Sequence, residues 1–451
     1  MSLALRKAAA PVYLLLCLLL GGSAQGIWTN ALLQMIGLGI IAWAAGSRFE
    51  PPMAKQPRVL LWIALFGLAI VVVQLIPLPS TLWSHLGGRS QIAADYGILG
   101  LKPPPMPISL APYSSIATLL AVIPAIAMFC AIVRLQAYRT SWLAIALVAG
   151  LFGGVLLGAL QVASAAPESS PWYLYPQSSF GFATGFFANA NHMATLLVIS
   201  LPFLAALLVS SRGASMQRYS AAAALVGGAV LVIIVGLALN KSLAGYGLAI
   251  AVIAASVAIV LPARKGLQRW ALVAAVALLM AGMVGLVLSP VGERNLEGRS
   301  SVGSRGEILA TTAEAIKDFM PLGSGLGTFR PVYQLYEDRD RVTATTMPHA
   351  HNDYAELVLE LGLPGAVLIL LFLLWWAASA ARAWGAGDST PFARAAAVAS
   401  AAILVHSIVD FPLRTAAISA CFAMCLALLA ERRTQRGGEK SELWPTRHMT
   451  F

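Results

Sequence analysis

Residues 353–378 read DYAELVLELGLPGAVLILLFLLWWAA, and this stretch decides the fold. Its charged side chains all lie in the first eight positions, and none follows from residue 361 to residue 378. A helix needs roughly 20 mostly apolar residues to cross the hydrocarbon core of a bilayer. Because no water is present there to bind the backbone polar groups, only a structure with internal hydrogen bonds satisfies them. The stretch therefore predicts a transmembrane helix.

The rest of the chain has the same character. It is 59% hydrophobic and 11% charged, whereas a soluble domain carries about a quarter charged residues, and its mean hydropathy is +0.78. We predict an all-α, polytopic transmembrane bundle of about twelve spans. Residues 1–431 form this domain, with a long, partly helical outer loop at 290–352, and residues 432–451 form a tail. The predicted spans lie near 10–25, 27–46, 58–77, 112–134, 141–163, 188–209, 219–239, 242–262, 269–289, 353–378, 392–410 and 414–430.

The first span has two interpretations. Arg6 and Lys7, a short Leu-rich run and the small residues 22–25 also fit a secretory signal with a cleavage site. We predict that the span is retained. Removing it would leave the orientation of the other spans unchanged.

The formal net charge of +11 is explained by the positions of the basic residues. They fall in alternate loops, and the short loops on the other face, near 22–26 and 164–187, contain no Lys or Arg. By the positive-inside rule, the basic side is cytoplasmic, and both termini lie there. Nucleic-acid binding is not needed to explain the charge. The basic positions are Arg6, Lys7, Arg48, Lys55, Arg58, Arg134, Arg139, Arg212, Arg218, Arg264, Lys265, Arg269, Arg382, Arg394, Arg432, Arg433, Arg436 and Lys440.

The cysteines lie inside apolar spans rather than in outer loops, so we expect packing and no disulfide framework. They are Cys17, Cys130, Cys421 and Cys425.

The outer loop 290–352 predicts a helix. Ser304 and Glu307 have the spacing of a capping box, and Pro321 ends the pattern. An apolar stripe recurs along this helix and would lie against the membrane domain or in its interface. The stripe consists of Leu309, Ala313, Ile316 and Met320. A glycine-rich turn follows at 322–329.

The same loop carries His349 and His351, with Arg305 and Arg330 upstream. Imidazole titrates near neutrality and accepts a proton from an attacking hydroxyl. Guanidinium groups hold phosphate oxygens while negative charge grows on a leaving diphosphate. The alternative is that the histidines cap a helix and the arginines meet lipid head groups; residue chemistry alone leaves both open.

No metal site or cofactor is predicted. Asp338 and Asp340 have the D-x-D spacing of a divalent-metal site, but they alternate with Arg339 and Arg341, so a solvated charged run is favoured. The glycines at 323–327 lack the Gly-Lys-Ser/Thr of a phosphate-binding loop.

Polar residues also stand near span ends, where ionisable groups usually face the bundle interior or a wet cavity. They are Asn189, Asn191, His192, Lys241, His406 and Asp410. For His406 and Asp410, one turn apart, a structural pair with Arg414 and a direct functional role are both open. An interfacial belt is the favoured interpretation of the aromatics between 172 and 187.

Several motifs together resemble the O-antigen ligase/polymerase superfamily of bacterial envelopes. The hallmark is His351–Leu357 (HNDYAEL) followed by Glu360–Gly365 (ELGLPG). Gly185–Ala194 is similar to the family's Gly-x-Phe-x-Asn-x-Asn element, and Pro321–Phe329 to its Gly-rich loop. Residues 74–79 (QLIPLP) and 406–414 (HSIVDFPLR) resemble members tied to exopolysaccharide and O-antigen assembly.

The resemblance implies a metal-independent, membrane-embedded glycosyltransferase. It would take glycan from an undecaprenyl-diphosphate carrier on the periplasmic face of the inner membrane and pass it to a lipid A-core or glycan acceptor. His351 would be the catalytic histidine and Arg305 the loop arginine. The family commonly has Ser-Arg-x-Gly where this chain has Ser242-Leu243-Ala244-Gly245, so Lys241 is the nearby cation. The predicted residues that bind diphosphate or glycan are Lys241, Arg330, Asn189, Asn191, His349, Asn352 and Asp353.

Within this class, an O-antigen ligase, an O-antigen or exopolysaccharide polymerase and a protein O-oligosaccharyltransferase share donor and motif, so the sequence leaves all three open. A transporter or flippase of the lipid-linked glycan is the alternative from another class. The sequence favours the enzyme, because no Lys or Arg and few carboxylates lie mid-span, where an ion-coupled relay would sit, and no inverted repeat is apparent.

Overall fold

The computed structural model describes residues 3–24, 27–47, 54–261, 274, 296–337, 347–385 and 389–431. Within these ranges the only strands are β1 (Pro77–Leu78) and β2 (Met106–Pro107), which pair antiparallel with Pro77 opposite Pro107. The helices are, in chain order, α1 (Leu3–Leu20), α2 (Trp28–Gly46), α3 (Lys55–Gln74), α4 (Ser80–Trp83), α5 (Ser90–Ile98), α6 (Pro112–Ala121), α7 (Ile123–Val133), α8 (Thr140–Val162), η1 (Pro167–Ser169), α9 (Ala190–Ser210), α10 (Met216–Asn240), α11 (Leu243–Val260), α14 (Leu296–Phe319), α15 (Phe329–Tyr336), α16 (Asp353–Gly385), α17 (Pro391–His406), η3 (Pro412–Arg414) and α18 (Ala416–Ala430).

The chain is an all-α polytopic membrane protein, as predicted. Eight of the described spans are long and apolar enough to cross a bilayer. They are α2, α3, α6 with α7, α8, α9, α10, α11 and α16. Helices α17 and α18 are shorter but apolar. Each predicted span corresponds to a described helix except the one near 269–289, which lies outside the described residues.

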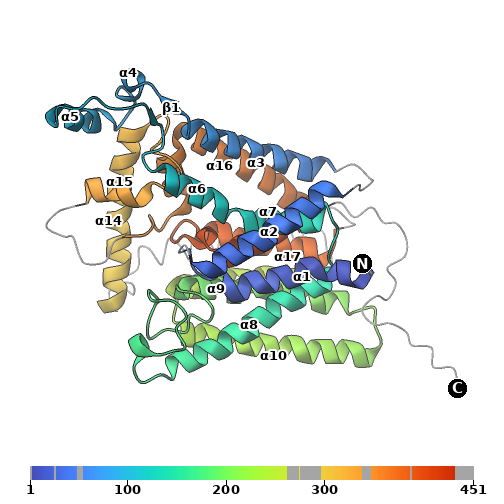
Figure 1. Cartoon of the computed structure of the whole chain (residues 1–451). Coiled ribbons are helices and arrows are strands. Elements are labelled where there is room, and N and C mark those ends of the chain that lie inside the picture. The colour runs from blue at the N-terminus through green and yellow to red at the C-terminus, as the bar shows by residue number, and fades with distance from the viewer. Residues whose placement is uncertain are drawn as a thin grey trace.

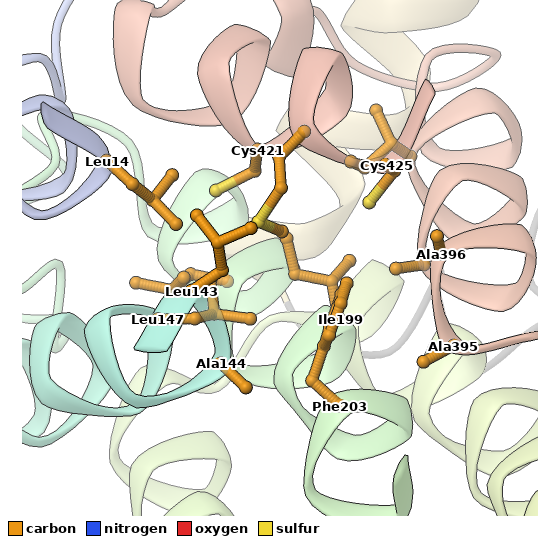
Figure 2. Close-up of a cluster of buried hydrophobic side chains, with 14 of the residues drawn as sticks. Leu14, Leu143, Ala144, Leu147, Ile199, Phe203, Ala395, Ala396, Cys421 and Cys425 are labelled. Carbon is orange, nitrogen blue, oxygen red and sulfur yellow. The ribbon is translucent and has the colours of Figure 1, made fainter. Parts of the chain in front are cut away.

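Helix α9 lies at the centre of the bundle. It packs against α8, α10, α11 and α17. In its apolar stretch 78% of the residues are buried, whereas in the apolar stretch of α3 only 11% are buried. Figure 2 shows the core beside α9, where Ile199 and Phe203 meet side chains of α1, α8, α17 and α18. Cys421 and Cys425 belong to this cluster, so they pack as small apolar side chains.

Helix α1 is part of the same core. Leu14, Cys17 and Leu18 are fully buried, and the Tyr13 hydroxyl donates a hydrogen bond to the Leu33 carbonyl at 2.9 Å. The helix packs against α7, α8 and α18. In the folded molecule, α1 is therefore an integral helix of the bundle.

The two ends of the bundle differ. At the end where α1 begins, Arg6 donates to the Leu135 carbonyl and Arg134 donates to the Ser47 carbonyl, so predicted basic-side residues gather there. At the opposite end, α14 lies across the ends of the spans with α15 beside it (Figure 1). The loop that carries the His motif enters α16 at this second end.

The capping prediction for the outer helix is wrong, and its apolar stripe packs against the bundle only in part. Helix α14 begins at Leu296, so Ser304 lies within the helix and does not cap it. The buried face is Ile308, Thr312, Ala315 and Phe319, whereas Leu309 and Ala313 are exposed. The Thr312 hydroxyl donates to the Ile308 carbonyl at 2.6 Å, which allows this polar residue to lie on the buried face.

The outer end is held together where α16 crosses the glycine-rich turn. Gly362 has φ 64° and ψ −148°, and a Cβ on it would lie 2.2 Å from the Pro321 carbonyl oxygen. A Cβ on Gly323 would lie 2.4 Å from the Glu360 carbonyl oxygen. The buried amide of Gln74 donates at 2.9 Å to the carbonyls of Leu322 and Glu360. Two motifs that are far apart in sequence therefore interlock, and α3 fixes them.

Several aromatics that the sequence assigns to an interfacial belt pack into the outer loop between α8 and α9. Tyr173, Tyr175 and Phe187 are buried, and Trp172 is exposed. The Gln161 amide organises the loop, donating to the Gly185 carbonyl at 3.0 Å while its oxygen accepts from the Gly185 N–H at 2.9 Å. These aromatics anchor the loop on the bundle, just before α9 begins.

Candidate catalytic site around Asp410

Asp410 is the centre of a polar cluster at the outer end of the bundle. It follows the end of α17, and its side chain is fully buried. The Phe411 N–H donates to Oδ1 at 2.9 Å, and the Asn191 amide donates to Oδ2 at 2.5 Å. A buried carboxylate needs such donors, because the loss of water is otherwise uncompensated.

Three basic side chains from three different segments surround this carboxylate. Arg305 on α14 lies 3.7 Å from Oδ2, and His351, before α16, places Nδ1 3.4 Å from Oδ1. His192 on α9 places Nε2 3.8 Å from Oδ1. Burial alone would raise the pKa of Asp410, but His351, Arg305 and His192 together lower it well below its ordinary value. The site therefore holds a carboxylate anion at neutral pH.

The backbone of His351 is in the left-handed region, with φ 50°. This conformation is uncommon for a residue other than glycine and is found mostly where the surrounding structure imposes it. Because Nδ1 faces Asp410, Nε2 is the nitrogen left to meet an incoming group. Carboxylate, imidazole and a free ring nitrogen in this order resemble the base-and-orienter arrangement of hydrolytic triads.

The Asn-x-Asn motif connects this centre to two helices. Asn189 caps α9, with its side-chain oxygen accepting from the Asn191 N–H at 2.8 Å. Asn191 donates to Asp410 and accepts from the Ser242 hydroxyl at 2.8 Å. Ser242 in turn caps α11 by accepting from the Gly245 N–H at 3.0 Å. The serine of the motif at 242–245 therefore belongs to the cluster.

A second set of contacts fixes the segment that carries the histidines. Glu356, on the first turn of α16, accepts from the Ala350 N–H and contacts His349 Nδ1, both at 2.9 Å. The Asn352 oxygen accepts from the N–H groups of Tyr354 and Ala355 at 3.0 Å and 2.9 Å. The amide of Asn352 also donates to the Ile408 carbonyl at 2.9 Å, so it ties the His segment to the Asp410 loop.

Arg414 is the hub of this second set. Its guanidinium lies 3.5 Å from Asp353, 3.2 Å from Glu356 and 3.4 Å from Glu360. Burial lowers the pKa of Arg414, but the three carboxylates outweigh it and raise the pKa above its ordinary value. Among the described residues, no group of three or more His, Cys, Asp or Glu is arranged to hold a metal ion.

The suggested pairing of His406 with Asp410 and Arg414 is wrong. Helix α17 ends at His406, and the Nδ1 atom of this residue lies 2.6 Å from the Thr195 hydroxyl. Asp410 contacts the residues named above, and Arg414 pairs with the acids of α16. The Asp410 N–H still donates to the His406 carbonyl at 3.0 Å, but the two side chains take different hydrogen-bond partners.

The predicted site residues fall into three groups. His351, Arg305 and Asn191 meet at Asp410, while Asn189, His349, Asn352 and Asp353 hold the segments around it. Lys241 and Arg330 are exposed, and within the described residues no hydrogen bond or ion pair joins either to Asp410. The backbone of Lys241, directly before Ser242, is in the left-handed region, with φ 56°. The charged run at 338–341 lies outside the described residues.

Sequence reasoning did not give Asp410 its central place, and it missed Glu356 and Gln161. Asp410 had one available signal, because an ionisable residue at the end of an apolar span usually faces the bundle interior. Glu356 and Gln161 each lie near the end of a predicted helix. That position does not indicate which residue of another segment they contact.

A search of curated proteins finds no match to the chain. Residues 197–370, less than half of the chain, match the family model described as O-antigen ligase. This segment contains Arg305, the glycine-rich turn, His351 and Gly362, and it begins just after the Asn-x-Asn motif. The match confirms the resemblance of the chain to the O-antigen ligase/polymerase superfamily.

Proposed function

We propose that the protein transfers glycan from an undecaprenyl-diphosphate carrier to an acceptor hydroxyl on the periplasmic face of the bacterial inner membrane. The observation that carries this proposal is the meeting of His351 and Arg305 at the buried carboxylate of Asp410. A base and a fixed cation stand together at the membrane surface, where a lipid-linked diphosphate sugar presents its reacting carbon.

In the proposed reaction, the acceptor hydroxyl gives its proton to Nε2 of His351, and its oxygen attacks the anomeric carbon of the donor. The bond from that carbon to the diphosphate oxygen breaks, and undecaprenyl diphosphate leaves with the bonding electrons. Asp410 stabilises the imidazolium that forms. Arg305 is 26% exposed and stabilises the charge on the leaving diphosphate. No metal is invoked.

The remaining predicted residues support this reaction in different ways. Asn189 and Asn191 hold the start of α9 against Asp410, and His349, Asn352 and Asp353 hold the segment that carries His351. The exposed Lys241 and Arg330 are proposed to contact the glycan or the diphosphate from the rim. The acceptor is lipid A-core for a ligase and a carrier-linked glycan for a polymerase.

The test replaces the two reacting groups. We expect His351→Ala and Arg305→Ala each to lower transfer by roughly 100-fold or more, measured as product in liposomes that contain purified protein and the lipid-linked donor. His85→Ala and Arg218→Ala are matched controls, since both residues are exposed and distant in sequence from the cluster. Unchanged transfer in both test variants would contradict the proposal, and donor movement across the bilayer without product would favour a flippase.

A deletion strain distinguishes a ligase from a polymerase. In a deletion strain, a missing ligase leaves long chains on the carrier, whereas a missing polymerase leaves single repeat units. Gel profiles of lipopolysaccharide and of carrier-linked glycan distinguish these outcomes.

The proposed orientation follows from the basic end of the bundle and is tested separately. Single cysteines replace Gln91 or Glu168 at the outer end and Gln217 at the other. A membrane-impermeant maleimide added to intact spheroplasts should label the first two positions and label Gln217→Cys only after lysis. The opposite pattern would place the Asp410 cluster in the cytoplasm and contradict the proposal.

A further inference from the structure

His192 is a buried polar side chain that the proposed reaction does not use. It lies in the first turn of α9 and is 2% exposed. Within the described part of the chain, neither ring nitrogen has a hydrogen-bond partner. A buried polar group without a partner costs stability, so a histidine at this place needs an explanation.

Packing alone does not supply one. The ring contacts Phe411 edge-on, with centroids 5.1 Å apart, and Phe187 with centroids 6.5 Å apart. An apolar side chain of similar volume would satisfy these neighbours without leaving two nitrogens unpaired. The polar group that the imidazole approaches is Asp410, with Nε2 3.8 Å from Oδ1.

Oδ1 of Asp410 is the oxygen that also faces His351, whose Nδ1 lies at 3.4 Å. Two imidazoles therefore flank one carboxylate oxygen. The Phe411 ring makes T-shaped contacts with both, with centroids 5.1 Å from His192 and 5.0 Å from His351. Arg305 approaches the other oxygen from α14. His406 on α17 also interacts electrostatically with Asp410, and His349 interacts with His192.

We propose that His192 is a positioning residue that acts through Asp410 to set how tightly His351 holds a proton. This role rests on the proposed function. A neutral imidazole with its N–H on Nε2 directs a dipole at Oδ1 and takes up part of the negative charge there. The contact is longer than a hydrogen bond, and such contacts in unliganded sites tighten when substrate binds.

Removing the His192 side chain should shift the activity profile in one direction only. Without the His192 dipole, the full charge of Asp410 is available to the imidazolium form of His351. His351 then holds its proton to higher pH and becomes a competent base only at higher pH. The acid limb of the activity profile therefore moves upward.

The experiment measures transfer against pH with purified protein in liposomes, using the cells' own undecaprenyl-diphosphate-linked repeat as donor. We expect His192→Leu to move the midpoint of the acid limb upward by roughly half a pH unit. His192→Gln, whose amide nitrogen stands near the position of Nε2, should keep the wild-type midpoint. A purely structural role would lower the rate at every pH and leave the midpoint in place, and that result overturns the inference.

Other results of this experiment also bear on the role of His192. If His192→Leu does not accumulate, His192→Asn is measured instead, because its shorter amide does not reach Asp410; an unmoved midpoint then overturns the inference. If the wild type forms no glycosidic product, the proposed function fails and this role fails with it. If transfer depends on His351 but His192→Leu leaves the midpoint of the acid limb unchanged, only the role of His192 is overturned.

Discussion

At the scale of single residues, Asp410 determines the chemistry of the site. Its carboxylate gathers Asn191 from α9, Arg305 from α14 and His351 from the loop before α16. Removing one partner of a buried ion pair is costly because the other charge is left without compensation. Under the proposed function, Asp410 therefore contributes to both catalysis and folding, and experiment has to separate the two effects.

Acid titration provides that separation. The folded-state pKa of Asp410 is lowered, so its contribution to stability is present above the unfolded pKa of about 3.9 and is lost as the pH falls through the folded pKa. We expect Asp410→Asn to lower the free energy of unfolding by about 3 kcal/mol at pH 7, with the difference from wild type shrinking below about pH 4. Thermal unfolding in detergent measures this difference.

The matched control for this titration is Asp95→Asn, because Asp95 is exposed on α5. It should lower stability by less than about 0.5 kcal/mol at any pH. A loss of stability in Asp410→Asn that persists unchanged at pH 3 would count against ionisation as the cause.

Sequence reasoning reached His351 and Arg305 because each stands in a recognisable local pattern. It named Asp410 as an ionisable group near a span end but did not place it between these two residues. Asn191, Arg305, His351 and Asp410 are separated by no regular period, and periodicity is the signal that a single sequence offers. A carboxylate after an apolar span looks the same whether it faces a partner on the next helix or the surface.

At the scale of elements, the crossing of α16 and the glycine-rich turn is the rigid part of the outer end. The backbone of Gly362 lies near a region of φ and ψ that is essentially restricted to glycine. Its position lets the Leu363 N–H donate to the Pro321 carbonyl at 2.8 Å and the Gly325 N–H donate to the Glu360 carbonyl at 2.8 Å. The proximity of two backbones, more than side-chain chemistry, explains the glycines here.

We expect Gly362→Ala to destabilise the protein by about 1–3 kcal/mol from backbone strain alone, with a further loss because its Cβ meets the Pro321 oxygen at 2.2 Å. The yield of monodisperse protein in detergent and its thermal midpoint are the measurements. Gly228→Ala on α10 is the control, since nothing lies within 4 Å of its Cβ, and alanine there should be neutral or slightly stabilising. Equal behaviour of the two variants would contradict this account of the crossing.

The outer helix shows where element-scale prediction fails. The pattern at 309, 313, 316 and 320 predicted a helix in the right region but with the wrong buried face. One residue corresponds to about 100° of rotation around a helix. Thr312 is polar, so the apolar pattern does not assign it to the buried face. Its hydroxyl donates a hydrogen bond within the helix, so it can lie on the packed face, which is one residue earlier than predicted.

At the scale of the whole molecule, hydropathy predicted the spans but not their order in space. In a bilayer, a central helix and a lipid-facing helix are similarly apolar, because lipid tails are as apolar as leucine. Helices α9 and α3 have mean hydropathies of 2.3 and 2.0, although the first is the most buried of the eight spans and the second the least. The central position of α9, on which Asn191 and His192 depend, therefore had no signal in the sequence.

The packing of α1 allows a prediction at this scale. Its side chains fill the core next to α8 and α18, so we expect amino-terminal sequencing to show that purified protein retains α1. A chain that lacks residues 1–25 should fail to accumulate as a monodisperse species, because several fully buried side chains are lost together. A mature terminus near residue 25 in active protein would contradict this prediction.

Asp410 and Arg414 lie between α17 and α18, the last two helices described. Chains are built and inserted from the amino terminus onward, so the histidine segment emerges from the ribosome before the carboxylate and the guanidinium that fix it. Under the proposed function, a chain that stops before residue 410 therefore carries no complete site. On the same proposal, activity requires synthesis at least as far as Arg414, and no shorter fragment would transfer carrier-linked sugar to a wrong acceptor.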